Sequence, residues 1–237
     1  MRRRSGLTGV IWGAALLLAP CAFADCRLAL ALAFDVSNSV GAADYAIQHQ
    51  GLLAALADPE IRHAILDPPD PVALALYEWS GRDHQLMIVD WTVIRTAGDL
   101  DAVMTQIRTH QRDPRRWATA LGRALIFGRA LMDAAPPCVE QVLDMSGDGA
   151  NNDSTEPWNA YASRDFGALR VNGLAILSYE PDVAEYYRDH VIRGRGAFVE
   201  IAEGQEDFPR AIRRKLLREL TEQVVGMDAG AAGRAGG

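Results

Sequence analysis

Five oxygen-bearing side chains, spread over three stretches of the sequence, have the types and spacing expected of a site for a hard divalent cation. They are Asp35, Ser37, Ser39, Thr119 and Asp148. Two carboxylates and three hydroxyls give an oxygen-only set with a formal charge of −2, which suits Mg²⁺ better than zinc. A coordination position held by water could accept a carboxylate from a binding partner. The set therefore predicts a metal site that could also take a ligand.

The elements around these residues would bring them to one place. The apolar run 28–34 ends at Asp35, and the apolar run 139–145 ends just before Gly147-Asp148-Gly149. Runs of this kind are typical of central parallel strands, which helices cover on both faces. Ligands of open parallel sheets bind at the carboxyl ends of the strands. We therefore expect both aspartates, and Thr119 at the start of a helix, to meet at one sheet edge.

The rest of the chain alternates between strands and helices, as expected for a doubly wound, mostly parallel α/β sheet of six strands with helices on both faces. Besides the two strands above, we expect strands at 72–79, 85–91, 171–178 and 197–201, and helices at 44–56, 99–108, 120–132, 161–169, 183–192 and 208–225. The short turn at 80–83 predicts a hairpin, and hence one antiparallel edge strand. No second domain is expected.

The two ends of the sequence differ from this domain, which we place at residues 25–225. Residues 1–24 are predicted to be an export signal, with a basic start, an apolar core at 10–18 and a small-x-small cleavage site at Ala22-Phe23-Ala24. Cys21 allows a lipoprotein interpretation, which Pro20 disfavours. The Gly/Ala-rich stretch 226–237 is expected to be disordered. The mature protein is thus expected to be soluble and either periplasmic or secreted.

The charge of the mature chain argues against two classes of partner. The full sequence has a formal charge of −7, and the predicted signal carries three arginines and no acidic residue. Its removal leaves 21 basic and 31 acidic side chains, a formal charge of −10. Such a surface repels nucleic acid and anionic membranes, so neither is expected as a partner.

Cysteine usage agrees with export. Cleavage after Ala24 leaves an even pair, Cys26 and Cys138, each at the start of a predicted strand. If those two strands are adjacent and parallel, the thiols lie side by side at the far edge of the sheet, and we predict a disulfide. The alternative is two separate buried thiols, and the geometry decides between them.

The spacing Asp35-x-Ser37-x-Ser39, a threonine that opens a helix, and Asp148-Gly149 after a buried strand together resemble the von Willebrand factor A (VWA) domain. These five residues match that family's metal-ion-dependent adhesion site. The order of strands and helices over 27–225 is also similar. More narrowly, Glu78-Trp79-Ser80 and the stretch 146–152 resemble an uncharacterised bacterial branch of these domains.

The resemblance implies a role for each matched residue. Ser37, Ser39 and Thr119 would coordinate the ion directly, and Asp35 and Asp148 would often act through water. It also implies the strand order 3-2-1-4-5-6, which places the two cysteine-bearing strands side by side. The implied function is an exported binding module, not an enzyme, that captures a protein or peptide through bound Mg²⁺ or Mn²⁺.

Two other classes of function compete with this one. The loop 147–153 resembles the acidic loop of haloacid-dehalogenase-type phosphatases, with Asp35 as a conceivable nucleophile. Against that, Ser37 occupies the position of the acid/base aspartate, and the lysine expected ahead of the loop is missing because the only lysine is Lys215. The third class is a structural domain with an empty site.

Each stretch of the predicted site also has a simpler interpretation on its own. The serines and Thr119 could cap the helices that follow them, and 147–149 could be a plain turn. The five histidines are scattered without ligand spacing, which favours surface or core roles. Trp117 and Trp158 flank the site loops and could line a partner contact. Asp144, inside a buried strand, could accept hydrogen bonds from those loops.

Overall fold

The computed structural model describes residues 26–113, 115 and 117–232, and its described side chains end at residue 222. The predicted signal peptide, with Cys21 and the cleavage site at Ala24, lies outside the described residues. None of the described helices is both long enough and apolar enough to cross a membrane.

Within the described residues, six strands form one sheet in the order β3-β2-β1-β4-β5-β6. All neighbours are parallel except β2 and β3, which are antiparallel. This confirms the predicted fold class, strand order and antiparallel edge. The strands are β1 (Cys26–Asp35), β2 (Val72–Trp79), β3 (Gln85–Ile94), β4 (Cys138–Gly147), β5 (Arg170–Ile176) and β6 (Val199–Ala202).

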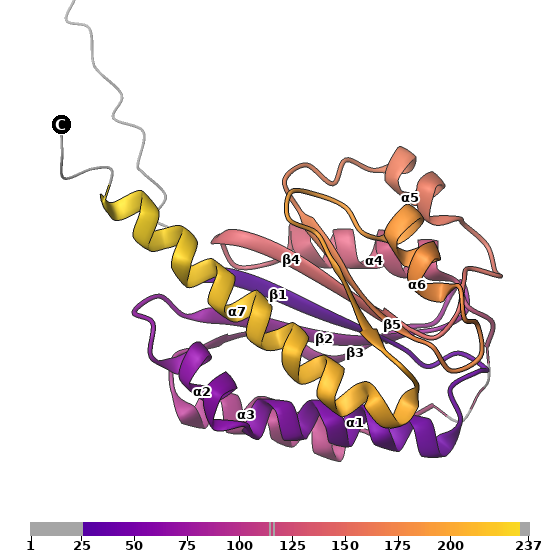
Figure 1. The fold of residues 1–237 in the computed structure, drawn as a ribbon, viewed down its shortest axis with the longest axis horizontal. Helices are drawn as coiled ribbons and strands as arrows, with labels where there is room; N and C mark the ends of the chain where they lie inside the picture. Colours follow the sequence, from indigo (N-terminus) through magenta and orange to yellow (C-terminus); the bar gives the residue numbers. More distant parts are fainter. Residues whose placement is uncertain (1–25, 114, 116, 233–237) are drawn as a thin grey trace, which may run out of the picture.

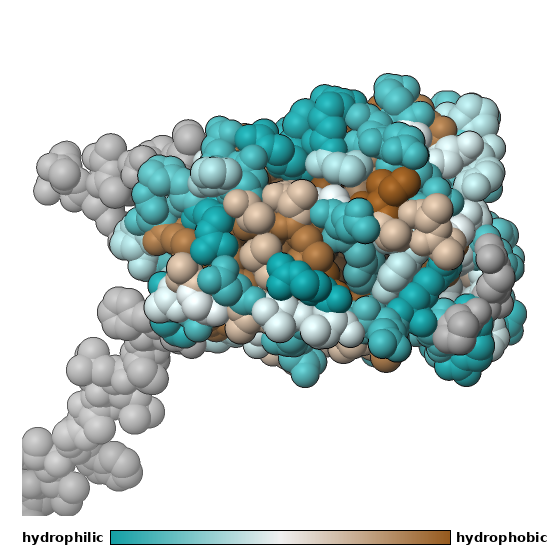
Figure 2. Space-filling model, turned by 90° about the horizontal axis from the view of Figure 1, so that it is seen from below, coloured by the Kyte–Doolittle hydropathy of each residue, from teal (hydrophilic) through white to brown (hydrophobic). Residues whose placement is uncertain are grey.

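Helices cover both faces of the sheet (Figure 1). One face packs against α1 (Ala42–Ala57), α2 (Pro59–Leu66), α3 (Ala97–Thr109) and α7 (Phe208–Ala232). The other face packs against α4 (Leu121–Asp133), α5 (Pro157–Ser163) and α6 (Val183–Tyr186), which continues into a π-helical turn at Tyr187–Val191. Seen from the side of α1 to α3, the surface is mostly polar, with a band of hydrophobic residues between the polar ones (Figure 2).

The central strand β1 shows why the sequence folds this way. All ten of its residues are buried, and leucines alternate with alanines along it. Because side chains of a strand point alternately to its two faces, Leu28, Leu30 and Leu32 pack toward α1 and α7, whereas Ala31 and Ala33 face α4. The strand therefore ends at Asp35 between two covered faces, at the carboxyl edge of the sheet.

Three elements differ from the sequence-based prediction. The helix predicted at 44–56 is followed directly by a second helix, α2, which Asp58-Pro59 begins because the Asp58 carboxylate accepts from the backbone N–H groups of Glu60 and Ile61. The helix predicted at 161–169 is instead α5, which Pro157 begins. The closing helix runs to Ala232, so residues 226–232, expected to be disordered, are helical. Residues 233–237 lie outside the description.

The predicted disulfide is confirmed. Cys26 and Cys138 are paired in the register of β1 and β4, with Cα atoms 4.5 Å apart, and their sulfurs are bonded. The bridge joins the first residues of the two central strands, at the end of the sheet opposite Asp35.

Candidate metal centre

The site begins at the last residue of β1. The Asp35 carboxylate turns back over the chain, and its Oδ1 accepts a hydrogen bond of 2.7 Å from the backbone N–H of Ser37. This turn bends the backbone at the end of the strand and keeps the Ser37 hydroxyl over the sheet edge. Both side chains are fully buried.

A chain of hydroxyl contacts then links the three stretches of sequence. Ser37 Oγ lies 3.2 Å from both Thr119 Oγ1 and Ser39 Oγ, and Ser39 Oγ donates to Asp148 Oδ1 at 2.5 Å. All five residues predicted from the sequence therefore lie together at the carboxyl edge of the sheet. Neither serine caps α1, whose N-cap is Gly41, and Thr119 does not cap α4, whose N-cap is Ala120.

Asn152 holds Thr119 in place. In the sequence this asparagine stood out only as part of the stretch 146–152, which resembles a bacterial branch of VWA domains. Asn152 Oδ1 accepts from the backbone N–H of Thr119 at 2.8 Å, and the Asn152 N–H donates back to the Thr119 carbonyl at 2.9 Å. On the other side, the backbone N–H of Asn38 donates to the Trp117 carbonyl at 2.8 Å. The threonine loop is thus hydrogen-bonded to both of the other site loops.

Gly147 allows the two aspartates to approach each other. A Cβ atom at this position would lie 2.5 Å from the Tyr187 hydroxyl and 3.1 Å from Asp35 Oδ2, so a side chain here would displace the first aspartate. The backbone can therefore pass close to Asp35 and deliver Asp148 to the edge.

The electrostatics of the site favour a bound cation. Burial and the neighbouring Asp148 carboxylate raise the pKa of Asp35 to about 8, and burial also raises the pKa of Asp148. Asp35 Oδ2 is buried and finds no hydrogen-bond partner among the described residues. An orphaned buried carboxylate oxygen among hydroxyls is costly unless a positive charge lies beside it. The residues present therefore fit a hard divalent ion.

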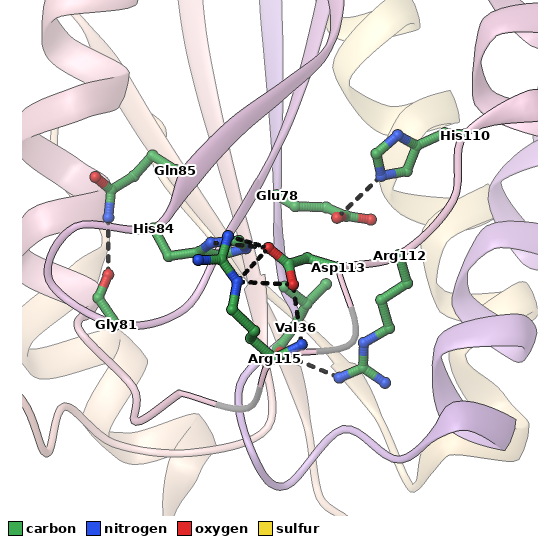
Figure 3. A network of polar contacts seen from close by, with 9 residues as sticks. All are labelled: Val36, Glu78, Gly81, His84, Gln85, His110, Arg112, Asp113 and Arg115. Atoms are coloured by element: carbon green, nitrogen blue, oxygen red, sulfur yellow. Dashed lines mark hydrogen bonds and ion pairs between the residues drawn. The ribbon is translucent and has the colours of Figure 1, made fainter.

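Arg112 is a residue that sequence analysis missed. Its guanidinium donates to the carbonyl of Val36 at 3.0 Å (Figure 3). It also donates to the carbonyls of Val40 and Gly41 at 2.7 and 3.1 Å, and it lies over the ring of Tyr45. It comes from the same segment as Thr119 and holds the loop that carries both serines. No spacing in the sequence indicates this contact, because the acceptors are backbone carbonyls.

A buried carboxylate, Glu78, fixes the start of that segment. It lies at the end of β2, and His110 Nε2 is 3.2 Å from its carboxylate (Figure 3). The carboxylate also accepts from Tyr45 Oη at 2.6 Å and lies 3.0 Å from His49 Nε2. Burial alone would raise the pKa of Glu78, but the hydrogen bonds from His110, His49 and Tyr45 outweigh it and lower the pKa to about 2. Two histidines that looked scattered in the sequence therefore meet at one acid.

Two further residues complete the surroundings of the site. Gln205, just before α7, donates to Asp148 Oδ2 at 3.3 Å and accepts from Gln48, and no sequence signal predicts either contact. Trp117 is 39% exposed and lines a cavity of about 310 Å³ beside the site, with its ring near His84 and Arg115. Trp158 is also exposed.

One correction concerns a residue away from the hydroxyls. Asp144 accepts no hydrogen bond from the described residues of the site loops; it points toward α7 and forms an ion pair with Lys215. Among the described residues, no three or more His, Cys, Asp and Glu side chains are arranged to hold a metal. The candidate centre combines three hydroxyls with two carboxylates, so it is not a cluster of that His/Cys/Asp/Glu type.

Comparison with known proteins assigns the chain to a family. The family model described as "Protein of unknown function (DUF1194)" matches residues 25–224. The comparison with curated proteins gives no match.

Similar solved structures include proximal thread matrix protein 1 from the mussel byssus, with a zinc-occupied MIDAS motif (13% identity, TM-score 0.59, covering 82% of this chain and 46% of that one). A von Willebrand factor type A protein from Catenulispora acidiphila is 14% identical, with a TM-score of 0.57 over 82% of this chain and 43% of that one. The pilus adhesin SpaC from Lactobacillus rhamnosus GG is 10% identical, with a TM-score of 0.56 over 82% and 31%.

At these identities the likeness shows the fold alone, and the chain spans less than half the length of each of these three proteins. The family match, by contrast, covers most of the sequence. The chain therefore belongs to the DUF1194 family and has the von Willebrand factor A fold.

Proposed function

We propose that this protein is a binding module that holds Mg²⁺ or Mn²⁺ at its carboxyl sheet edge and uses the ion to capture a carboxylate of a protein or peptide partner. The ligand set is Asp35, Ser37, Ser39, Thr119 and Asp148. The observation that carries the proposal is the buried Asp35 Oδ2, which has no hydrogen-bond partner among the described residues, beside a row of contacts that runs from Thr119 through Ser37 and Ser39 to Asp148.

The chain's own groups would share the work of holding the ion. The three hydroxyls would coordinate it directly, and the two carboxylates would balance its charge, in part through water. The bound ion would supply an electrophilic position for a partner's carboxylate. Arg112 would hold the serine loop and Asn152 the threonine loop. Both side chains bond to backbone atoms of those loops, so the side-chain oxygens of the ligand residues stay available to the ion.

A phosphatase function has less support from the structure. The chain's only lysine is fully buried against Asp144 and Glu219, so it is not available to the site as that chemistry would require. Ser37 also lacks the acid/base capacity needed two residues after a nucleophilic aspartate. A structural domain without bound metal is the remaining alternative, and a metal titration separates it from a binding module.

We also propose that the protein works outside the cytoplasm. The Cys26–Cys138 disulfide supports this, because such bonds persist in oxidising compartments. Residues 1–24 would then be removed as a signal, which agrees with the family match beginning at residue 25.

Metal-dependent capture from a native cell-envelope extract tests the proposal. Immobilised protein is incubated with the extract in Mg²⁺, in chelator, and as the Thr119→Ala variant. Thr109→Ala is the matched control, since the hydroxyl of this exposed threonine donates to backbone carbonyls of its own helix. We expect a protein retained by the wild type and the control in Mg²⁺ and released by chelator or by Thr119→Ala. If the same proteins are retained in chelator and by the Thr119→Ala variant, the proposal is contradicted.

A further inference from the structure

The chain's only lysine lies in a buried cluster of charged and polar groups between α7 and the centre of the sheet. Lys215 Nζ is 2.8 Å from Asp144 Oδ2 on β4 and 2.7 Å from Glu219 Oε1 on α7. Asn172 on β5 donates to the same Glu219 oxygen at 2.6 Å. The side chains of Lys215, Asp144 and Glu219 are fully buried.

An ordinary ion pair accounts poorly for this cluster. One ammonium faces two carboxylates, which leaves an unbalanced negative charge in the core when all three groups are ionised. Asp144 Oδ1 and Glu219 Oε2 are buried and accept no hydrogen bond from any described residue. The ring of Phe198, 4.9 Å from Lys215 Nζ, covers the amine. Buried acceptors without partners are expensive, so a neutral form of the cluster is favoured.

We propose that Lys215 and Asp144 are joined by an intramolecular amide bond that the folded chain forms itself, with Glu219 as the proton-transfer group. The geometry already approaches that of the reactants. Because a carboxyl C–O bond is about 1.25 Å long, the amine lies no more than about 4 Å from Asp144 Cγ. Fixing two reacting groups at such a distance replaces a bimolecular encounter with an intramolecular step.

The reaction balances without any co-reactant. It starts from protonated Asp144, the Lys215 ammonium and the Glu219 carboxylate. Glu219 takes a proton from the ammonium, and the neutral amine attacks Asp144 Cγ to form the C–N bond. Glu219 passes protons from the nitrogen to the oxygens, the C–OH bond breaks, and one water molecule leaves. The cluster is neutral before and after the reaction, and it ends as an amide beside protonated Glu219.

The contacts assign separate roles to the two acids. Glu219 Oε1 accepts from both Lys215 and Asn172, an arrangement that suits an ionised base. Asp144 Oδ2 forms an ion pair with Lys215, and neither Asp144 oxygen accepts a hydrogen bond of good geometry from the described residues. Burial raises the pKa of Asp144 to about 7, which keeps it protonated and electrophilic more readily than an exposed acid. Asn172 is a poorer electrophile because its carbonyl carbon is part of an amide, which resonance makes less reactive than a protonated carboxyl group, and its amide nitrogen donates to Glu219.

The bond would anchor α7 to the middle of the sheet. Asp144 pairs with Leu32 on one side and Asn172 on the other, so it lies between the strands of the core. The amide would be separate from the disulfide, which joins β1 and β4 at their first residues. This inference does not depend on metal binding, and each can fail without the other.

Mass spectrometry of the reduced, denatured protein tests the bond directly. We expect the chain to be lighter than its sequence by one water molecule. After trypsin digestion, the peptide 215–218 should be attached to the peptide 130–164, because an acylated lysine blocks cleavage after residue 215. Lys215→Arg and Glu219→Gln should restore the full mass. Glu222→Gln, which alters an exposed ion pair on the same helix, should keep the loss of water.

Several results would overturn the proposal. Full mass in the wild type, with free peptide 216–218, would leave only an ion pair. Loss of ammonia with a cross-link to the peptide 171–188 would assign the bond to Asn172. A link between 215–218 and the peptide that begins at Glu219 would assign it to that acid. The wild-type measurement decides among these outcomes even when a variant fails to fold.

Discussion

Ser39 Oγ donates a 2.5 Å hydrogen bond to Asp148 Oδ1 across 109 residues of sequence. The serine follows β1 and the aspartate follows β4, and these strands are neighbours in the sheet. The contact therefore depends on the strand order and on Gly147, which lets the backbone pass close to Asp35. It joins the two carboxylate-bearing loops into one cluster of oxygen atoms.

Asp148→Ala should abolish stabilisation by Mg²⁺. At a free metal concentration of about 100 times Kd, a single site stabilises the fold by about 2.7 kcal/mol, and the variant should lose this increment. Thermal unfolding with and without Mg²⁺ measures it. Asp153→Asn is the matched control, because this acid in the same loop pairs with Arg82 instead. An undiminished response in Asp148→Ala would remove that residue from the ligand set.

Arg112→Gln should weaken metal binding without removing a ligand. The substitution takes away the hydrogen bonds to Val36, Val40 and Gly41 that hold the serine loop. We expect about 10- to 100-fold lower affinity, as for other residues that orient metal ligands. Calorimetric Mn²⁺ titration measures the change. Arg115→Gln, on the same segment but paired with Asp113, should bind as the wild type does; equal weakening in both would refute a specific role.

Reduction of the Cys26–Cys138 bond should lower the free energy of unfolding by about 2–5 kcal/mol. The bridge spans 112 residues, so its loss gives the unfolded chain much more freedom. Denaturant unfolding with and without reductant measures the difference, and a Cys138→Ser variant should match the reduced wild type. Two free thiols in non-reduced peptide mapping would be incompatible with the bond.

Glu78→Gln should make the protein's stability less sensitive to acid. The pKa of Glu78 is lowered from 4.5 to about 2, so its contribution is complete above about pH 4.5 and is lost as the pH falls toward 2. The wild type should lose about 3 kcal/mol more than the variant over this range. Unfolding free energies at several pH values measure both slopes. If the free energy of unfolding changes equally with pH in the wild type and the variant, ionised Glu78 and its histidine and tyrosine partners do not stabilise the fold.

The sequence was most informative where local pattern and tertiary structure agree. The alternating Leu/Ala run of β1, ending in Asp35, is buried on both faces and so predicts its own place in the sheet. Helix boundaries were less predictable, because Pro157 rather than hydrophobic spacing begins α5.

Several contacts between distant segments could not be predicted from spacing, because one partner is a backbone atom or lies on an element that no pattern places against the site. Arg112 bonds to backbone carbonyls, which any residue carries. Gln205 reaches Asp148 only because the turn before α7 lies against the site. Asp144 stood out as an acid in an apolar strand, but its partner is 71 residues away on the closing helix.

Direct titration of the purified protein with Mn²⁺, followed by competition with Mg²⁺, tests the central claim most directly. We predict one site per chain in the wild type, displaced by Mg²⁺ and lost in Ser37→Ala and Thr119→Ala. Absence of a site in the folded wild type, or unchanged binding in both variants, would contradict a metal centre built on these hydroxyls.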